Sequence, residues 1–283
     1  MNLKAKTLLA TAIAALVIVG CGKDDATSSE NTKTAEAVPS KEVKLGLVGE
    51  HNEEWQYVQK KLAEQGITLT IVKFADYTLP NRSLNDGEID LNAFQHVAFL
   101  NAENEQKGFH NVAIADTIIA PLGLYSKKIK SVQEIKDGDT IAIPNDVTNG
   151  GRALKVLELA GLIKLKDPSS YTPSVRDISE NPLHIKFYEA DAGNLPSLLP
   201  DVTASIINNN YCFDNGIDPL KDAIFSDGTG KIDPSNPYIN IIAAKEERKD
   251  DPLFKEVVKA YQTKEVADLI YQYHKGSVPV FKY

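Results

Sequence analysis

Cysteine is nearly absent from this sequence, and its scarcity excludes folds that are held together by disulfides or by zinc bound to cysteine. The 283 residues include only Cys21 and Cys212, too few for a disulfide framework or a thiolate zinc site. Basic residues are also few relative to acidic ones, 31 against 39, and the net charge of −8 argues against nucleic acid as a partner. Because 42% of the residues are hydrophobic, the chain is too apolar to be intrinsically disordered. We therefore expect an acidic, globular protein.

Motifs that carry catalysis or bind metal ions are missing as well. The sequence has no GxSxG elbow, no Walker motif and no HExxH pair. Acidic pairs such as Asp250-Asp251 are explained by solvation or helix capping. The sequence therefore predicts no enzyme, no catalytic residue and no cofactor. It also predicts no metal site, because its five histidines are dispersed: His51, His96, His110, His184 and His274.

One long hydrophobic run is present, at the N-terminus, and it indicates export. Thr7–Val19 carries no charge and follows Lys4 and Lys6. It is shorter than the roughly 20 residues that a membrane-spanning helix needs, but it fits a secretory signal. Ile18-Val19-Gly20-Cys21 then resembles a bacterial lipobox, in which Cys21 is diacylated and becomes the mature N-terminus. The alternative is a plain signal peptide with a chance cysteine.

The segment after this signal has almost no large apolar side chain. We expect residues 1–20 to be a signal peptide and 21–41 a flexible tether. Removing 1–20 leaves 29 basic and 39 acidic residues, a formal net charge of −10. The mature protein is expected at the cell membrane, lipid-anchored through Cys21 on the extracytoplasmic face. Cys212, without a partner, is expected to be a small buried side chain.

From Glu42 onward, strand-like and helix-like segments alternate, which predicts an α/β fold with parallel sheets. A second set of alternating strands and helices begins after 121–125, so we expect two lobes joined by two extended crossovers. The first lobe is assigned 42–122 plus 242–283 and the second 123–241. Expected strands are 43–49, 67–74, 89–91, 112–119, 140–144, 185–188, 203–207 and 238–244. Expected helices are 53–65, 80–87, 95–106, 151–160, 194–199 and one or two within 252–275. Ligands bind beyond the carboxyl ends of such strands, in a cleft between the lobes.

The most informative segment runs from Pro144 to Arg152 (PNDVTNGGR). A strand is expected to end at Pro144, a loop to turn on Gly150 and Gly151, and a helix to begin near Arg152. A helix N-terminus attracts anions, and an arginine can hold a carboxylate in a bidentate fork. The glycine spacing is not that of a phosphate-binding loop, which favours a carboxylate over a nucleotide. On spacing alone, a surface arginine beside a glycine turn is equally compatible.

A second group, Asn92-Ala93-Phe94-Gln95-His96, places a histidine beside an aromatic residue at a strand-to-helix junction. Such a histidine donates to an anion or lines an apolar pocket. Taken alone, a packed or capping histidine is the more common case.

Several ordered motifs together resemble one known family, from about Val43 to the end of the chain. The sequence is similar to the NlpA family of bacterial methionine-binding lipoproteins, the solute-binding components of methionine ABC importers. The motifs are Phe74–Asn81, Gly87–Asp90, Asn92–His96, Tyr125–Ser131, Ile143–Asp146 with Thr148-Asn149 and Gly151-Arg152, Gly161–Lys166, Asn181-Pro182 and Pro237–Asn240.

The resemblance implies a two-lobe periplasmic-binding-protein fold, type II-like, that closes on an amino acid. It implies that Arg152 grips the ligand carboxylate and that Asn149 supports that loop. Asn208 and Asn240 would bond the amino and carboxylate groups. The thioether side chain would be walled by Tyr77, Phe94 and His96. The implied partners are L-methionine, an ABC permease with its ATPase, and the membrane through the anchor; we expect a monomer.

One departure concerns the pocket wall. Where relatives commonly continue His-Lys-Pro-Tyr, this sequence has His96-Val97-Ala98-Phe99. If Phe99 replaces a pocket tyrosine, a hydroxyl is lost and the wall becomes more apolar. A short methionine-containing peptide or another hydrophobic amino acid therefore stays open as the ligand. A surface interaction lipoprotein with the same fold is the alternative of a different class.

Overall fold

The structure is a computed structural model that describes residues 41–228 and 233–283, which belong to one compact unit, Pro39–Tyr283. The predicted signal peptide, the lipidation site Cys21 and nearly all of the tether lie outside the described residues. Among the helices that are described, none is both long and apolar enough to cross a membrane.

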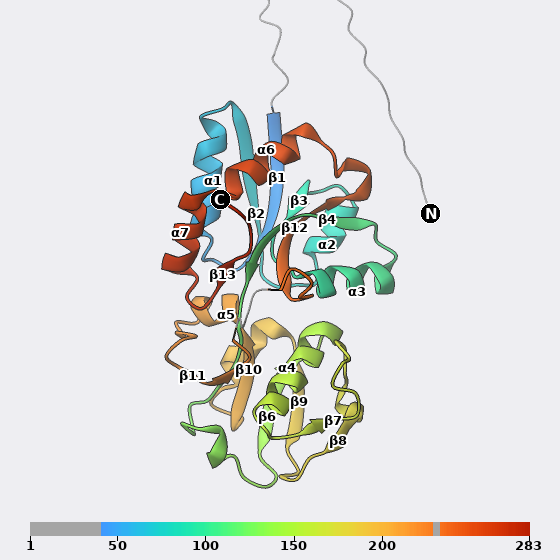
Figure 1. Cartoon of the computed structure of the whole chain (residues 1–283), viewed down its shortest axis with the longest axis vertical. Helices are drawn as coiled ribbons and strands as arrows, with labels where there is room; N and C mark the ends of the chain where they lie inside the picture. The colour runs from blue at the N-terminus through green and yellow to red at the C-terminus, as the bar shows by residue number, and fades with distance from the viewer. Residues whose placement is uncertain (1–40, 229–232) are drawn as a thin grey trace, which may run out of the picture. The chain divides into compact units, whose positions relative to one another are not determined.

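Two β-sheets with flanking helices form two lobes (Figure 1). The first sheet has the order β13-β4-β12-β3-β1-β2 and the second β11-β5-β10-β6-β9, while β7 and β8 form a separate pair. The strands are β1 (Lys41–Val48), β2 (Ile67–Phe74), β3 (Leu91–Asn92), β4 (Asn111–Ile119), β5 (Leu122–Tyr125), β6 (Thr140–Pro144), β7 (Lys164–Leu165), β8 (Ile178–Glu180), β9 (Lys186–Ala190), β10 (Ala204–Asn208), β11 (Ala223–Ser226), β12 (Ile239–Lys245) and β13 (Val278–Pro279). The α-helices are α1 (Glu53–Ala63), α2 (Pro80–Asn85), α3 (Val97–Lys107), α4 (Val147–Leu159), α5 (Asn209–Asp214), α6 (Pro252–Tyr261) and α7 (Lys264–Tyr273). The expected short helix at 194–199 is a 3₁₀ helix, Ala192–Leu198.

The two-lobe α/β fold is confirmed, but the expectation of parallel sheets is wrong in part. Strands β1, β2 and β3 are parallel, whereas β12 runs antiparallel to both β3 and β4. In the second sheet β5 runs antiparallel to β10 and β11. The reason is that β5 and β12 are the strands by which the chain enters each sheet from the other lobe. They come in at the carboxyl ends of the parallel strands and must run the opposite way.

The chain crosses between the lobes twice, from β4 to β5 and from β11 to β12. We propose that the lobes meet at these crossings, close to the predicted limits of 42–122 with 242–283 and 123–241. Because both crossings leave from carboxyl ends of strands, those ends face each other. The arrangement places the loops after β2, β3, β6 and β10 around the space between the lobes.

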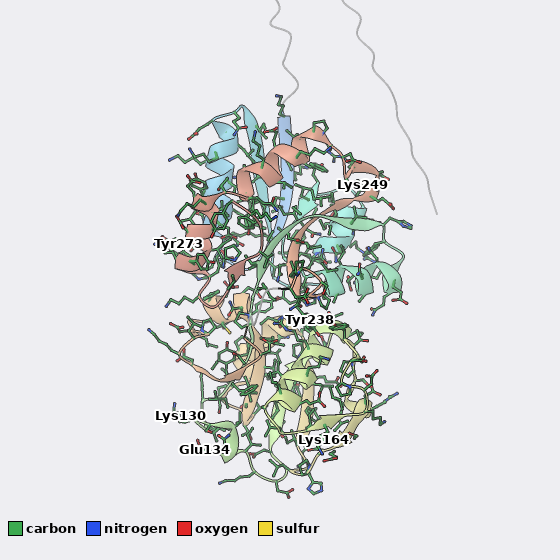
Figure 2. All side chains as sticks on the ribbon, viewed as in Figure 1. Lys130, Glu134, Lys164, Tyr238, Lys249 and Tyr273 are labelled. Atoms are coloured by element: carbon green, nitrogen blue, oxygen red, sulfur yellow. The ribbon has the colours of Figure 1, made fainter. Side chains whose placement is uncertain are left out.

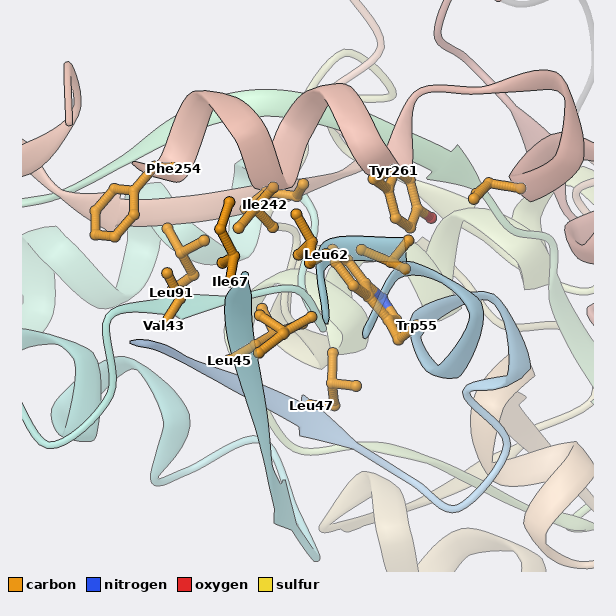
Figure 3. Close-up of a cluster of buried hydrophobic side chains, with 14 of the residues drawn as sticks. Val43, Leu45, Leu47, Trp55, Leu62, Ile67, Leu91, Ile242, Phe254 and Tyr261 are labelled. Atoms are coloured by element: carbon orange, nitrogen blue, oxygen red, sulfur yellow. The ribbon is translucent and has the colours of Figure 1, made fainter. Parts of the chain in front are cut away.

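The first lobe is built around a core that β1 shares with three helices (Figure 3). Helix α1 buries Trp55, Val58 and Leu62 on one face, with acids in its first turn and lysines in its last. The ring of Trp55 stacks on Tyr261 of α6, with centroids 4.4 Å apart. The predicted periodicity of 53–65 is thus confirmed by the packing it directs. In the second lobe, Cys212 is a buried free thiol, as expected, and burial raises its pKa to about 12.

Candidate functional site

A cavity of about 120 Å³ lies between the two lobes. A single water molecule needs only about 10–15 Å³ of such space, so the cavity has room for a larger ligand. All eight candidate ligand-binding residues line it: Tyr77, Phe94, His96, Phe99, Asn149, Arg152, Asn208 and Asn240. The first lobe supplies the aromatic residues and His96, and the second supplies Asn149, Arg152 and Asn208. Asn240 stands near the start of β12, where the chain returns to the first sheet.

The start of helix α4 differs from the sequence prediction. The helix begins at Val147, not near Arg152, because the Asp146 side chain caps it by accepting from the backbone N–H groups of Thr148 and Asn149. These N–H groups are therefore satisfied within the protein. Arg152 lies in the second turn, so the expected combination of a free helix N-terminus and an arginine is wrong. The guanidinium alone is left to attract an anion.

Gly150 and Gly151 belong to this helix and form no turn, which corrects the second part of that prediction. A Cβ atom at Gly150 would lie 2.7 Å from the backbone oxygen of Pro144. One at Gly151 would lie 2.9 Å from Pro173 Cδ. Both glycines are explained by close packing of the helix against its neighbours. The close approach holds α4, and with it Arg152, against β6.

The Arg152 side chain is buried and held on three sides. Its Nε donates to an Asp227 carboxylate oxygen at 2.7 Å, and Nη2 donates to the Ala120 backbone oxygen at 2.8 Å. The guanidinium carbon lies 4.6 Å from the ring centroid of Tyr238, a cation–π contact. Tyr238 itself sits between the lobes (Figure 2). Of the five N–H groups of arginine, two are used, which leaves both on Nη1 and one on Nη2 to receive a carboxylate.

His96 is both a capping residue and a cavity residue. Its Nδ1 accepts from the Phe99 backbone N–H at 3.1 Å and caps α3. Burial and the positive charge of Arg152 lower the pKa of His96 to about 3, so the ring is neutral. Because Nδ1 is the acceptor, the proton is on Nε2. That atom faces Asn149 Oδ1 at 3.5 Å, too long for a strong bond, and is available to donate to a ligand.

The amides on the second-lobe side are linked to one another. Asn149 Nδ2 donates to both Asp146 oxygens, and its Oδ1 accepts from Asn208 Nδ2 at 2.8 Å. The other amide atom of Asn208, Oδ1, is buried and has no partner within the described residues. A buried acceptor without a donor needs an explanation, and this one belongs to a residue that lines the cavity. Asn240 forms an isolated β-bridge with His96, which ties the two candidates together.

Three aromatic rings gather on the first-lobe side. The Tyr77 ring centroid lies 5.8 Å from that of Phe94 and 5.9 Å from that of Phe99, and the last two are 5.9 Å apart. Tyr77 also reaches across the cavity, because its hydroxyl donates to Asn210 Oδ1 at 2.6 Å. The departure at Phe99 therefore contributes an apolar ring to this wall. The three rings form a surface suited to an uncharged, polarisable side chain.

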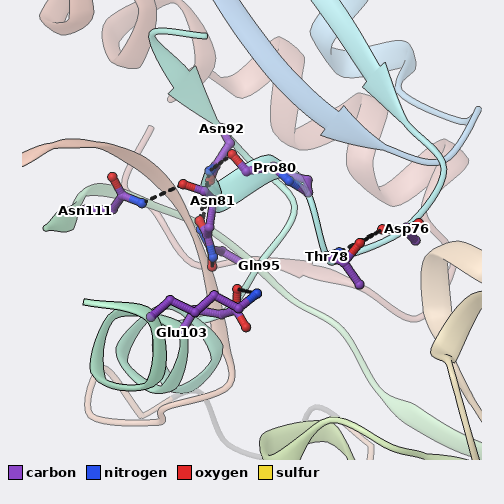
Figure 4. Close-up of polar contacts among 9 residues, drawn as sticks. Asp76, Thr78, Pro80, Asn81, Asn92, Gln95, Glu103 and Asn111 are labelled. Atoms are coloured by element: carbon purple, nitrogen blue, oxygen red, sulfur yellow. Dashed lines mark hydrogen bonds and ion pairs between the residues drawn. The ribbon is translucent and has the colours of Figure 1, made fainter. Parts of the chain in front are cut away.

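A buried network of amide side chains holds the loop that carries Phe94 and His96 (Figure 4). Gln95 exchanges two hydrogen bonds with Asn81, at 2.7 and 2.6 Å, and donates to Asn92 at 2.8 Å. Asn111 Nδ2 donates to the Asn81 backbone oxygen at 3.1 Å. Because Gln95 stands between Phe94 and His96, fixing its side chain fixes which way its neighbours point. This network positions the aromatic wall.

Sequence reasoning missed three residues of the site. Asp227 pairs with Arg152 from a distance of 75 residues along the chain, and no local pattern marks it. Tyr238 covers Arg152, and its buried hydroxyl has no partner among the described residues. Asn210 has a buried, unpaired Nδ2 in the cavity wall. The polar run at 208–210 after a predicted strand was the available signal for Asn210, and only its first residue was selected.

Two lobes that enclose a cavity with a cationic side and an aromatic side define the class of solute-binding proteins that close on a small ligand. The sequence model described as NlpA lipoprotein matches residues 43–281. This chain belongs to the NlpA lipoprotein family.

Relatives within and around this family are similar over nearly their whole length. The D-methionine-binding lipoprotein MetQ of Escherichia coli strain K12 is 38% identical over 272 residues, 94% of each chain. A Burkholderia cenocepacia nutrient-binding protein, solved bound to methionine, is 40% identical with a TM-score of 0.79, covering 84% of this chain and 100% of that one. The substrate-binding protein of a Streptococcus pneumoniae methionine transporter is 37% identical with a TM-score of 0.80, covering 85% and 96%.

Proposed function

We propose that this protein binds methionine in the cavity between its lobes and delivers it to an ABC importer. The observation that carries the proposal is the pairing, in one cavity, of a buried guanidinium having three free N–H groups with a wall of three aromatic rings. A free amino acid needs its carboxylate and its ammonium group satisfied when it leaves water. The cavity offers partners for both groups and an apolar surface beside them.

The carboxylate of the ligand is assigned to Arg152. Its Nη1 and Nη2 atoms form the fork that matches a carboxylate, while Asp227 and Tyr238 hold the fork in place. The Nε2–H of neutral His96 and the free Nδ2–H of Asn210 are further donors on the cavity wall. Asn149 has no spare amide proton and acts by orienting Asn208.

The ammonium group is assigned to Asn208, whose buried Oδ1 lacks a donor among the described residues. Asn240, bridged to His96, is placed to complete this end of the ligand. Neutral amide oxygens suit an ammonium group whose charge is already balanced by its own carboxylate on Arg152. Both ends of the zwitterion are thus met without a second buried ionic side chain.

The thioether side chain is assigned to the rings of Tyr77, Phe94 and Phe99. Contacts between a thioether sulfur and aromatic rings each contribute about 0.3–1.5 kcal/mol. An aliphatic side chain of similar length gains the free energy of burying apolar surface but not the sulfur–aromatic contact. The wall therefore favours methionine over an unbranched hydrocarbon side chain by a modest factor.

Delivery follows from anchoring and closure. The mature protein is proposed to be a monomer, not an enzyme, held on the extracytoplasmic face through a lipid on Cys21, and to pass its ligand to a permease and its ATPase. Its relatives support this: one is named a lipoprotein and another is the binding component of a methionine transporter. Ligand contacts from both lobes favour the closed state, which is the state a permease can distinguish.

Identification of the natural ligand tests the function. The full chain, purified in detergent without added amino acids, should release methionine when denatured, as detected by mass spectrometry. Calorimetry should then show saturable binding of methionine to the emptied protein, with L- and D-methionine, a methionine dipeptide and leucine compared. If the dipeptide or leucine binds more tightly than methionine, that compound is the ligand and methionine is not. Absence of any small-molecule binding would point to an interaction lipoprotein.

A further inference from the structure

A second group of side chains, away from Arg152, gathers where the start of α1 meets the end of α7. Glu53 and Glu54 stand in the first turn of α1, and His274 follows α7. Their ligand atoms, two carboxylate oxygens and an imidazole nitrogen, all lie within 4.8 Å of one another. His274 Nε2 is 2.6 Å from Glu54 Oε2, and these two side chains are 12% and 7% exposed. None of the three has a part in the proposed methionine contacts.

An ion pair between His274 and Glu54 explains only part of this group. One carboxylate is enough to balance one imidazolium, so Glu53 is surplus. Its Oε2 is nonetheless buried without a hydrogen-bond partner in the described part of the chain. Its Oε1 faces His51 Nδ1 at 3.3 Å. The buried Glu53 Oε2, which neither His51 nor His274 reaches, is the acceptor that a bound cation would satisfy.

The donor set indicates which cation. Two carboxylate oxygens and one imidazole nitrogen are hard-to-borderline ligands that suit a divalent transition ion, zinc above all. Three protein ligands leave the fourth position of a tetrahedral site open, and Glu54 and His274 line the cavity into which that position would face. His51 is placed to hydrogen-bond a ligand carboxylate, the usual support for a metal ligand. To reach zinc–ligand distances of about 2.0–2.2 Å, the Glu54 and His274 atoms, now 2.6 Å apart, would separate and the Glu53 carboxylate would move toward them.

We propose that Glu53, Glu54 and His274 bind one zinc ion, which ties α1 to the end of α7. The sequence analysis predicted no metal site because Glu54 and His274 are 220 residues apart along the chain.

Calorimetry tests this on the full chain, purified in detergent without a polyhistidine tag and stripped with a chelator that is then removed. Zinc chloride should bind with one ion per chain and a Kd of about 1 µM or tighter. Glu53→Gln and His274→Gln should each weaken binding at least about tenfold. His184→Gln should not, because that exposed histidine pairs with Asp137 at 2.6 Å without a second carboxylate.

Glu53→Gln is the deciding variant, because it leaves the His274–Glu54 pair intact and so keeps the fold. Zinc bound equally by Glu53→Gln and the unsubstituted chain would overturn the proposal and leave a structural ion pair. Calcium bound as tightly as zinc would overturn the assignment of the metal.

Discussion

The two lobes contribute opposite chemistry to one cavity. The first lobe supplies rings, with Tyr77, Phe94 and Phe99 on a loop and helix held by a buried amide network. The second lobe supplies charge and amides, with Arg152 in the second turn of α4 and Asn208 at the end of β10. Neither lobe alone can satisfy an amphipathic zwitterion. The difference explains why a ligand of this kind stabilises the closed arrangement, since only there do its charged groups and its side chain both have partners.

Removing the charge of the second lobe should have the largest effect. Arg152→Ala is expected to weaken methionine binding by about 4 kcal/mol, roughly a thousandfold in Kd, because the ligand carboxylate is left buried and unpaired. Isothermal titration calorimetry measures this directly. Lys155→Ala, one turn further along α4 and outside the cavity, is the matched control and should bind normally.

Arg152→Ala also leaves Asp227 without its partner, so folding needs its own check. The double variant Arg152→Met with Asp227→Asn removes both charges and should keep a normal thermal unfolding transition. It should still fail to bind methionine. Normal affinity in a folded double variant would contradict the assignment of the carboxylate.

The amide of the second lobe should come next. Asn208→Ala removes the proposed acceptor for the ligand ammonium and the donor to Asn149. We expect a loss of about 2 kcal/mol, roughly thirtyfold in Kd, as for a hydrogen bond to a charged group. Asn215→Ala, a neighbouring exposed asparagine outside the cavity, should leave affinity unchanged. A loss of less than twofold in Asn208→Ala would place the ammonium elsewhere.

The aromatic wall of the first lobe should contribute less per residue. Phe99→Leu is expected to cost about 1 kcal/mol, roughly fivefold in methionine Kd, because it removes a sulfur–aromatic contact while keeping apolar volume. The preference for methionine over norleucine, measured by competition, should narrow by the same factor. Phe187→Leu in the second-lobe core is the control. An unchanged preference would remove Phe99 from the side-chain wall.

Acidification should have the smallest effect on binding. With the pKa of His96 lowered to about 3, its ring is neutral from pH 8 down to pH 5. Methionine affinity should therefore change less than about twofold across this range as far as His96 is concerned. The unfolded chain takes up this proton near pH 6.5, so the contribution of His96 to stability falls as pH drops from 6.5 toward 3, by up to about 1.4 kcal/mol per pH unit.

The histidine variant isolates that effect. His96→Asn keeps a capping side chain. Its free energy of unfolding, measured by urea titration at several pH values, should fall less steeply below pH 6.5 than that of the unsubstituted chain. An equally steep fall in the variant would mean that other groups cause it.

The fold was largely predictable because its signals are local. Strands β2 and β6 have the predicted bounds, 67–74 and 140–144, since both segments are rich in β-branched residues and are bounded by polar turns. The short strands β7, β8, β11 and β13 were missed because two to four residues carry no periodicity. The direction of β12 was missed because it depends on how the chain re-enters the first lobe, which no segment encodes by itself.

The site was predictable in part, for a different reason. All eight selected residues line one cavity because the family resemblance assigned them as a set. The geometry around Arg152 was not predictable: a glycine pair suggests a turn, yet here it serves close packing inside a helix. Asp227 and Tyr238, which hold the guanidinium, come from distant segments and are visible only in three dimensions.

Diffraction from crystals soaked with selenomethionine tests the central claim most directly. Protein produced without selenium contributes none to the crystal, so any selenium peak in the anomalous map reports the ligand. We predict one peak among the rings of Tyr77, Phe94 and Phe99, with the ligand carboxylate on Nη1 and Nη2 of Arg152. A ligand whose carboxylate lies away from Arg152, or a selenium peak only outside this cavity, would contradict the account.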